Sequence, residues 1–198
     1  VLVREVMADG GVAWVCAGAK REVLEPLQAP GGVLHGFFET VRVGPVEAAE
    51  LAGWIDGRMR GSGVASDGVG AAVAARAGPR TQDVVQVARA LWFRGVLRGR
   101  VLASEVEDAV LDVVREQDAA LRRTWSDLTP MQQRVLRAVA ADATRLFGAD
   151  TRARFRLGPA SSVGTAVSAL VRRGVLHRGG DGVAFDDPFF RTWVQVRM

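Results

Sequence analysis

Apolar residues recur with a helical period in one stretch near the C-terminal end of the chain. They repeat at i, i+3, i+4, i+7 and i+8, at Val163, Ala166, Val167, Leu170 and Val171. This spacing predicts an α-helix with a single apolar stripe that packs on a core. Ser161 or Ser162 is expected to cap its first turn, and Gly174 suits the left-handed conformation that ends many helices.

Two short runs of strand-forming residues follow this helix, at 175–178 and 183–185, and a glycine-rich turn joins them. Upstream, Thr129 and Pro130 form a helix start for a helix that reaches about residue 141, and a shorter helix is expected at 148–155. The order of helix, helix, helix and hairpin predicts a winged helix-turn-helix over residues 126–198.

Residues 46–125 carry helical spacing throughout and predict a bundle of about four helices. The first spans 46–60, and the second spans 67–77 behind a Ser66 or Asp67 cap. The third begins at Gly78-Pro79, and the fourth is long, capped by Ser104 and ending near residue 124. The third helix is expected to face inwards with Val84, Val85, Ala88, Leu91 and Trp92.

Residues 1–45 show an α/β pattern. The near-continuous apolar run at 12–19 predicts a strand buried on both faces of a parallel sheet, 20–27 returns to helical composition, and 40–43 predicts a second strand. Two strands are too few for such a sheet, so this segment is expected to be the last part of a larger domain. The fold class predicted for the whole chain is mainly α with small β.

Composition narrows the class of protein. Apolar residues make up 48% of the 198 positions, which suffices for packed cores, and no run is long enough to span a bilayer. No signal segment is recognisable, and Cys16 is the only cysteine, so no intramolecular disulfide can form. These features predict a cytoplasmic protein without membrane contact.

Charge is unevenly distributed along the chain. Residues 129–198 contain 11 arginines against 5 aspartates, a net charge of +6, whereas residues 1–128 carry a net charge of −2. A basic C-terminal domain on a slightly acidic body is typical of nucleic-acid contact. An ordinary solvated basic surface is the alternative that composition leaves open.

Classical signals of catalysis are absent from the sequence. The two histidines, His35 and His177, lack metal-ligand spacing, and no nucleophile–base pair can be assembled. A phosphate-binding loop needs Gly-Lys-Ser/Thr, and Lys20, the only lysine, follows Ala19. We therefore predict no catalytic residue and no metal site, and we expect this chain alone not to hydrolyse a nucleotide.

The order of segments resembles the C-terminal part of AAA+-type ATPases, most closely the archaeal-ATPase/STAND branch of P-loop proteins. VAWVCAGAK resembles the sensor 1 strand and VRVGPVEAAEL the last core strand entering the lid. AGPRTQDVVQVARALW resembles the lid helix with its Gly-x-Pro or sensor 2 position. WSDLTPMQQRVLRAVA, SSVGTAVSALVRRGVL and FDDPFFRTWV resemble the winged helix and its terminal signature.

This resemblance implies three parts: the end of a P-loop core (1–45), a helical lid (46–125) and a winged helix (126–198). Walker A and Walker B, with bound ATP and Mg²⁺, would belong to a core upstream of Val1, and nucleotide-dependent homo-oligomers would be expected. The implied nucleotide contacts are Gly78, Pro79 and Arg80, with Pro45 at the hinge. Gly78-Pro79 also suits a simple helix end followed by a new helix start, with Arg80 solvated.

The winged-helix prediction supplies candidate contacts to double-stranded DNA. They lie on the polar face of the helix that precedes the hairpin, or on the wing: Ser162, Thr165, Ser168, Arg172, Arg173 and Arg178. Arg172 and Arg173 also stabilise the helix dipole without DNA. Three hypotheses stay open: the lid and winged helix of a regulatory ATPase, a stand-alone DNA-binding regulator, and a protein-interaction module in which the winged helix docks on the ATPase body or another protein.

Overall fold

A computed structural model describes residues 14–15, 27–39, 41, 43–143, 145–179 and 182–198. The chain forms two units, Val1–Gly44 and Pro45–Met198. In the first unit residues 27–28 are helical and successive turns follow, closed by a 2.8 Å hydrogen bond from the Leu34 amide to the Leu27 carbonyl.

The elements predicted for residues 1–45 lie mostly outside the described residues. The strand at 12–19, the helix at 20–27 and the strand at 40–43 therefore stay predictions. Their few described positions include Trp14, Val15, Val41 and Val43, which belong to no helix or strand.

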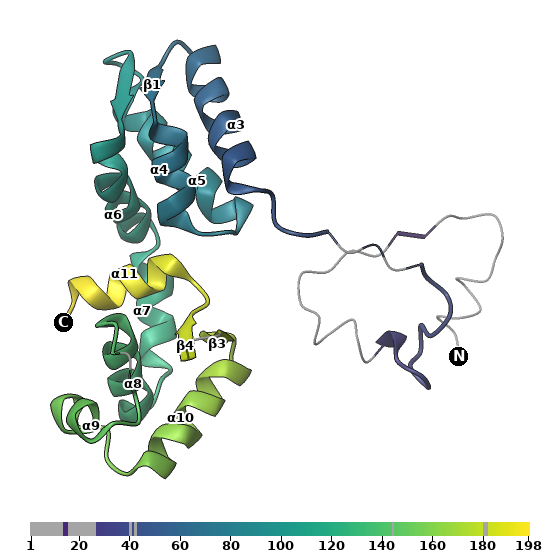
Figure 1. Cartoon of the computed structure of the whole chain (residues 1–198), viewed down its shortest axis with the longest axis vertical. Helices are drawn as coiled ribbons and strands as arrows, with labels where there is room; N and C mark the ends of the chain where they lie inside the picture. The colour runs from purple at the N-terminus through teal and green to yellow at the C-terminus, as the bar shows by residue number, and fades with distance from the viewer. Residues whose placement is uncertain (1–13, 16–26, 40, 42, 144, 180–181) are drawn as a thin grey trace. The chain divides into compact units, whose positions relative to one another are not determined.

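The second unit begins with a helical part that contains two very short strands (Figure 1). Its helices are α3 (Ala48–Gly61), α4 (Val69–Ala77), α5 (Thr81–Gly95) and α6 (Val106–Glu116), with a 3₁₀ turn η1 (Ala103–Glu105) before α6. Strands β1 (Ala65–Asp67) and β2 (Arg100–Leu102) pair in parallel, with Ser66 opposite Val101. The apolar stripes of the helices meet in a core that includes Ile55, Val73, Val84, Leu91 and Val110.

The predicted start of the second helix was wrong, and the structure gives the reason. Ser66 and Asp67 lie in β1, and α4 begins at Val69 after Gly68 in the left-handed conformation. The Ser66 hydroxyl instead donates to the Asp56 carboxylate over 2.9 Å, and the same oxygen accepts the Gly70 amide over 3.0 Å. A carboxylate from α3 thus satisfies an amide that we had expected a local cap to satisfy.

Three further predictions in this part need correction. Pro79 does not begin a helix, because α5 starts at Thr81 with Arg80 as its N-cap residue. Val85, which we predicted to face inwards, is 38% exposed, whereas Val87 is fully buried.

The predicted long helix from Ser104 is two helices, α6 and α7 (Asp118–Ser126), which meet at Gln117. Ser104 lies in η1, where the Glu105 carboxylate accepts the Leu102 amide over 2.9 Å.

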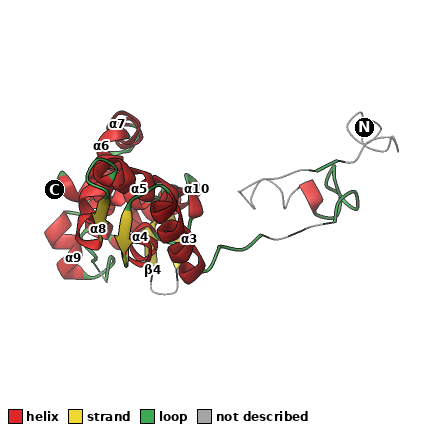
Figure 2. Ribbon diagram, turned by 90° about the horizontal axis from the view of Figure 1, so that it is seen from above, coloured by secondary structure: helices red, strands yellow, loops and turns green. Residues whose placement is uncertain are grey.

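The C-terminal part has the predicted order of three helices and a hairpin. It contains α8 (Pro130–Ala140), α9 (Ala149–Phe155), α10 (Ala160–Arg172), β3 (Leu176–Gly179) and β4 (Gly182–Phe185). Thr129 caps α8 as predicted, since its hydroxyl accepts the Gln132 amide. The strands pair antiparallel, with Leu176 opposite Phe185, and they are small beside the surrounding helices (Figure 2).

The ends of α10 agree only in part with prediction. Gly174 has φ +66°, as expected for the residue after a helix. Neither Ser161 nor Ser162 is the cap, because α10 already begins at Ala160 and its N-cap residue is Pro159. The Pro159 carbonyl accepts the Val163 amide over 3.2 Å, which places both serines inside the first turn.

The terminal Asp-Pro-aromatic segment forms an additional helix, α11 (Pro188–Val196), capped by Asp187. Its aromatic residues are buried as expected, and Phe190 and Trp193 pack against Trp125 of α7. The Trp193 indole N–H donates to Asp118 over 2.7 Å. Because α11 contacts both α6 and α8, it joins the helical part to the C-terminal part. Among the described helices, none has the length and apolar character needed to cross a bilayer.

Candidate nucleic-acid interface

A groove of about 840 Å³ separates α10 from the loop before α9 and from the hairpin. Buried apolar side chains, including Val167 and Leu146, form its base. Its polar and exposed wall residues come from three segments far apart in sequence: Asp142, Arg145 and Phe147 between α8 and α9, Ser168 of α10, and Arg178 of β3. The groove therefore combines residues of α10, of the loop before α9 and of the hairpin in one surface.

The accessible face of α10 carries small side chains and ends in an arginine. Ser161 and Thr165 are exposed, Gly164 and Ser168 are half-buried, and Arg172 is exposed at the last turn. The Thr165 hydroxyl donates to the Ser161 carbonyl over 3.1 Å, so it lies close to the helix backbone. A face of this kind lets the helix backbone approach a ligand closely, as a helix must to enter the major groove of DNA.

Among the described residues, most arginines of the C-terminal part have no carboxylate partner. Within the described residues, only Arg191 and Arg197 of the 11 arginines in 129–198 form ion pairs with acids. Arg145, Arg172 and Arg178 form none with the acids that the structure describes. Arg134 and Arg152 donate to backbone carbonyls, and the Arg154 guanidinium lies over the Phe155 ring.

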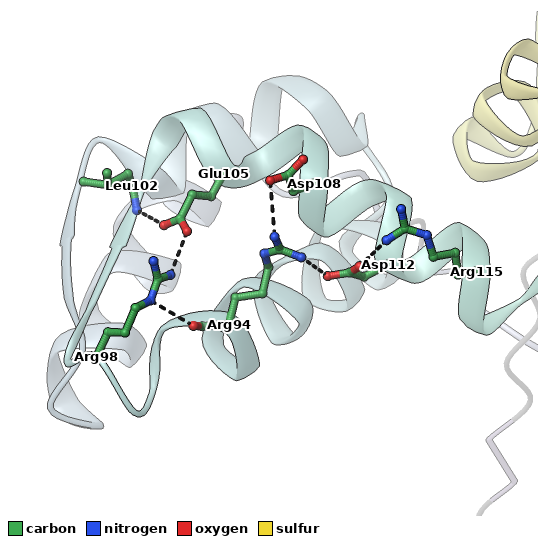
Figure 3. A network of polar contacts seen from close by, with 7 residues as sticks. All are labelled: Arg94, Arg98, Leu102, Glu105, Asp108, Asp112 and Arg115. Atoms are coloured by element: carbon green, nitrogen blue, oxygen red, sulfur yellow. Dashed lines mark hydrogen bonds and ion pairs between the residues drawn. The ribbon is translucent and has the colours of Figure 1, made fainter.

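The arginines of the helical part are used differently (Figure 3). Arg94 of α5 bridges Asp108 and Asp112 of α6, while Arg98 pairs with Glu105 over 2.6 Å and Arg115 pairs with Asp112 over 2.8 Å. Six of the 11 arginines in 46–128, a range that covers the helical part and α7, pair with carboxylates among the described residues, at positions 76, 80, 94, 98, 115 and 122. Among the described residues, carboxylates therefore pair with a larger share of the arginines there than around the groove, where Asp142 of the groove lining pairs with Arg191.

The structure distributes the six predicted DNA contacts over different surroundings. Ser168 and Arg178 line the groove, and Thr165 and Arg172 lie on the accessible face of α10. Ser162 is half-buried in the first turn. Arg173 is turned towards the body of the domain, since its guanidinium donates to the Asp127 carbonyl over 3.0 Å.

The predicted nucleotide contacts lie elsewhere. Pro45 precedes α3, whereas Gly78, Pro79 and Arg80 connect α4 to α5. The Arg80 guanidinium is not simply solvated, because it pairs with Asp83 over 2.8 Å and with Asp186, just after β4, over 3.0 Å. Arg80 thereby links the helical part to the segment that follows the hairpin.

Charge around Arg80 bears on its suitability for a nucleotide. Partial burial acts to lower the pKa of Arg80, but the surrounding carboxylates outweigh it and raise this pKa. Asp83 is only 5% exposed, and its burial raises the pKa of its carboxyl group. The positive charge of Arg80 offsets only part of that rise. Asp187 also lies nearby, so a phosphate group at Arg80 would meet several negative charges. In this arrangement Gly78, Pro79 and Arg80 do not fit a triphosphate.

Comparison with known proteins identifies the C-terminal part. A family model described as a probable winged helix domain matches residues 119–196, from α7 to the end of α11. The chain therefore contains a winged helix domain, with α10 before the two-stranded wing. No curated protein and no solved structure matches the chain.

Sequence reasoning missed Arg145 and Phe147 as groove residues. Phe147 is 52% exposed, and both residues lie in a loop that follows no recognisable motif. Only the fold brings this loop beside Arg178, more than thirty positions away in the sequence. An arginine and an aromatic side chain between two predicted helices were the only available signal.

Proposed function

We propose that the winged helix domain binds double-stranded DNA. In this proposal α10 enters the major groove, while Arg145 and Arg178 on either side of the groove contact phosphates. The contrast in arginine pairing carries the proposal. Within the described part of the chain, acids pair with six of the 11 arginines in 46–128 but with two of the 11 in 129–198, so Arg145, Arg172 and Arg178 can bind an external anion. Guanidinium groups bind phosphate oxygens through charge-assisted hydrogen bonds.

The small residues of α10 indicate how this helix would contact DNA. Gly164, Thr165 and Ser168 offer little for bidentate recognition of base edges, which is usually performed by Arg, Lys, Asn or Gln. Affinity is then expected to come mainly from phosphate contacts. Arg172, at the last turn of α10, adds a further cation along the same face.

Binding to a fluorescein-labelled DNA duplex tests this proposal. We expect Arg178→Ala and Arg145→Ala each to weaken binding by about tenfold at low salt, because each removes one phosphate contact. Arg100→Ala is the matched control, since Arg100 is an exposed arginine of the helical part. Equal affinity of all three variants and the wild type would reject the groove as the DNA site.

We propose further that the chain is the lid and winged-helix portion of an ATP-binding AAA+/STAND-type regulatory ATPase. The support is the order of segments in the sequence, together with the succession of a helical part and a winged helix. ATP and Mg²⁺ would be held by the complete protein, with Arg80 reaching the nucleotide only if it leaves Asp186. The winged helix would then contact DNA or dock on the ATPase body.

ATP titration of the complete gene product, with Arg80→Ala and Asp186→Asn variants, tests the ATPase proposal. If a phosphate competes with Asp186 for Arg80, Asp186→Asn should tighten ATP binding and Arg80→Ala should weaken it. A gene product that does not bind ATP would refute the proposal. Unchanged ATP affinity in both variants would remove Arg80 from the nucleotide site.

A further inference from the structure

A second groove, of about 620 Å³, lies between α3 and α5 on the helical part. Its base is buried and apolar, formed by Ile55, Met59 and Ala88. Trp54 of α3 and Trp92 of α5 line it, and Trp54 is 47% exposed. Large exposed aromatic side chains beside an apolar groove are typical of a protein-binding surface.

Glycine residues keep this groove open. Gly57 and Gly61 lie on the α3 side, and a Cβ at either position would meet no atom within 4 Å. Neither glycine has a positive φ, so neither is required by the backbone conformation. The missing side chains leave space above the base of the groove.

Hydrogen bonds hold the Trp92 side chain in place in the absence of a partner. Its indole N–H donates to the Ser62 hydroxyl oxygen over 2.9 Å, and that hydroxyl donates to the Met59 carbonyl over 2.8 Å. Met59 lies in the last turn of α3, and Ser62 is the C-cap residue of that helix. A side chain held in this way loses little conformational entropy on binding, which favours affinity.

The charge of the groove selects the kind of partner. Arg58 and Arg89 are the charged residues that line it, and neither pairs with a carboxylate within the described part of the chain. The Arg58 guanidinium lies 5.6 Å from the Trp54 ring centroid, and Arg89 lies 5.4 Å from that of Phe93. Each cation is therefore held beside an aromatic ring at the edge of an apolar surface.

We propose that this α3–α5 groove binds an amphipathic helix of a partner protein, with apolar residues on one face and Asp or Glu beside them. Apolar side chains would fill the space over Gly57 and Gly61, and the acids would pair with Arg58 and Arg89. Between Trp54 and Gly61 α3 rises about 10 Å, which matches two turns of a bound helix. A single-stranded nucleic acid is less suited, because its binding sites follow the backbone with a row of cations.

Selection from a phage-displayed library of random peptides, long enough for three helical turns, tests the proposal on the full chain. We expect enrichment of acidic peptides whose apolar residues repeat at i, i+3, i+4 and i+7. Synthetic copies of the enriched peptides would then be titrated against variants. Gly57→Leu fills the groove and raises helix propensity, so loss of binding in this folded variant cannot be attributed to unfolding.

The expected result is about tenfold weaker peptide binding for Gly57→Leu and for Arg58→Glu combined with Arg89→Glu. Gly53→Leu and Arg60→Glu are the controls on α3, since both residues lie outside the groove lining, and they should leave affinity unchanged. Enrichment of no peptides, of basic peptides, or of peptides insensitive to Gly57→Leu would overturn the proposal. Tighter binding of fluorescein-labelled oligo-dT with the same sensitivity to Gly57→Leu would assign the groove to nucleic acid instead.

Discussion

At the scale of single residues, Gly70 shows how closely α3 and α4 approach one another. A Cβ on Gly70 would overlap the backbone of Ala52, so any larger residue must push the two helices apart. Interiors are packed densely enough that such a displacement disturbs many contacts at once. The position explains why a glycine, a poor helix former, occupies the first turn of α4.

Gly70→Ala is therefore expected to lower the free energy of unfolding by about 1–3 kcal/mol through overpacking. Urea denaturation followed by circular dichroism measures this change. Gly53→Ala in α3 is the matched control, since Gly53 is exposed with open space around it. The control should gain up to about 1 kcal/mol from helix propensity, and a stabilised Gly70→Ala variant would contradict the packing argument.

At the scale of elements, the Arg80 ion pairs hold α5 to the segment that follows the wing. The buried Asp83 depends on Arg80 for its counter-charge, although burial still keeps its pKa raised. Its folded-state pKa is therefore above that in the unfolded chain, so the folded protein takes up this proton first as pH falls. Protonated Asp83 no longer needs a counter-charge.

Because the pKa of Asp83 is raised and its carboxylate is charged at neutral pH, Arg80→Met should destabilise the protein most at neutral pH, by about 1–3 kcal/mol. The substitution leaves a buried carboxylate without its partner. The loss should shrink as pH falls through the raised pKa of Asp83. Urea midpoints measured between neutral and acidic pH provide the test. Adding Asp83→Asn should recover stability at neutral pH, whereas a loss that is the same at every pH would refute this role for Arg80.

Sequence pattern predicted those elements whose signals are local. Thr129-Pro130 marked the start of α8, Gly174 marked the end of α10, and glycines between two strand-forming runs marked the wing. Where long-range contacts decide, prediction failed. Asp56 of α3 displaced Ser66 as the partner of the α4 amides, and pairing with β2 drew residues 65–67 into a strand.

The candidate site was predictable to a similar degree. Helical spacing placed Thr165 and Arg172 on the polar face of α10, and the hairpin prediction placed Arg178 on the wing. Arg173 was assigned to DNA from its neighbours, but a backbone carbonyl of the α7–α8 connection attracts it. Arg145 lay beyond local pattern altogether, because its approach to Arg178 exists only in the folded chain.

At the scale of the whole molecule, the chain separates two uses of arginine. Among the described residues, Arg76 and Arg94 join α6 to α4 and α5, and other arginines of the helical part pair with acids closer in sequence. The surface of this part also carries the apolar α3–α5 groove. Arginines of the winged helix domain surround α10 with few acids to neutralise them. Under our two proposals, DNA contact belongs to the winged helix domain and protein contact to the helical part.

The salt dependence of duplex affinity tests the central claim most directly. Binding of a fluorescein-labelled duplex would be measured at several potassium chloride concentrations for the wild type and for Arg145→Ala combined with Arg178→Ala. We predict a steep fall of the wild-type affinity with salt, and a logarithmic slope reduced by about 2 in the double variant, since each lost phosphate contact lowers it by about 0.9. Identical slopes for the two proteins, or an affinity that does not depend on salt, would contradict DNA binding through this groove.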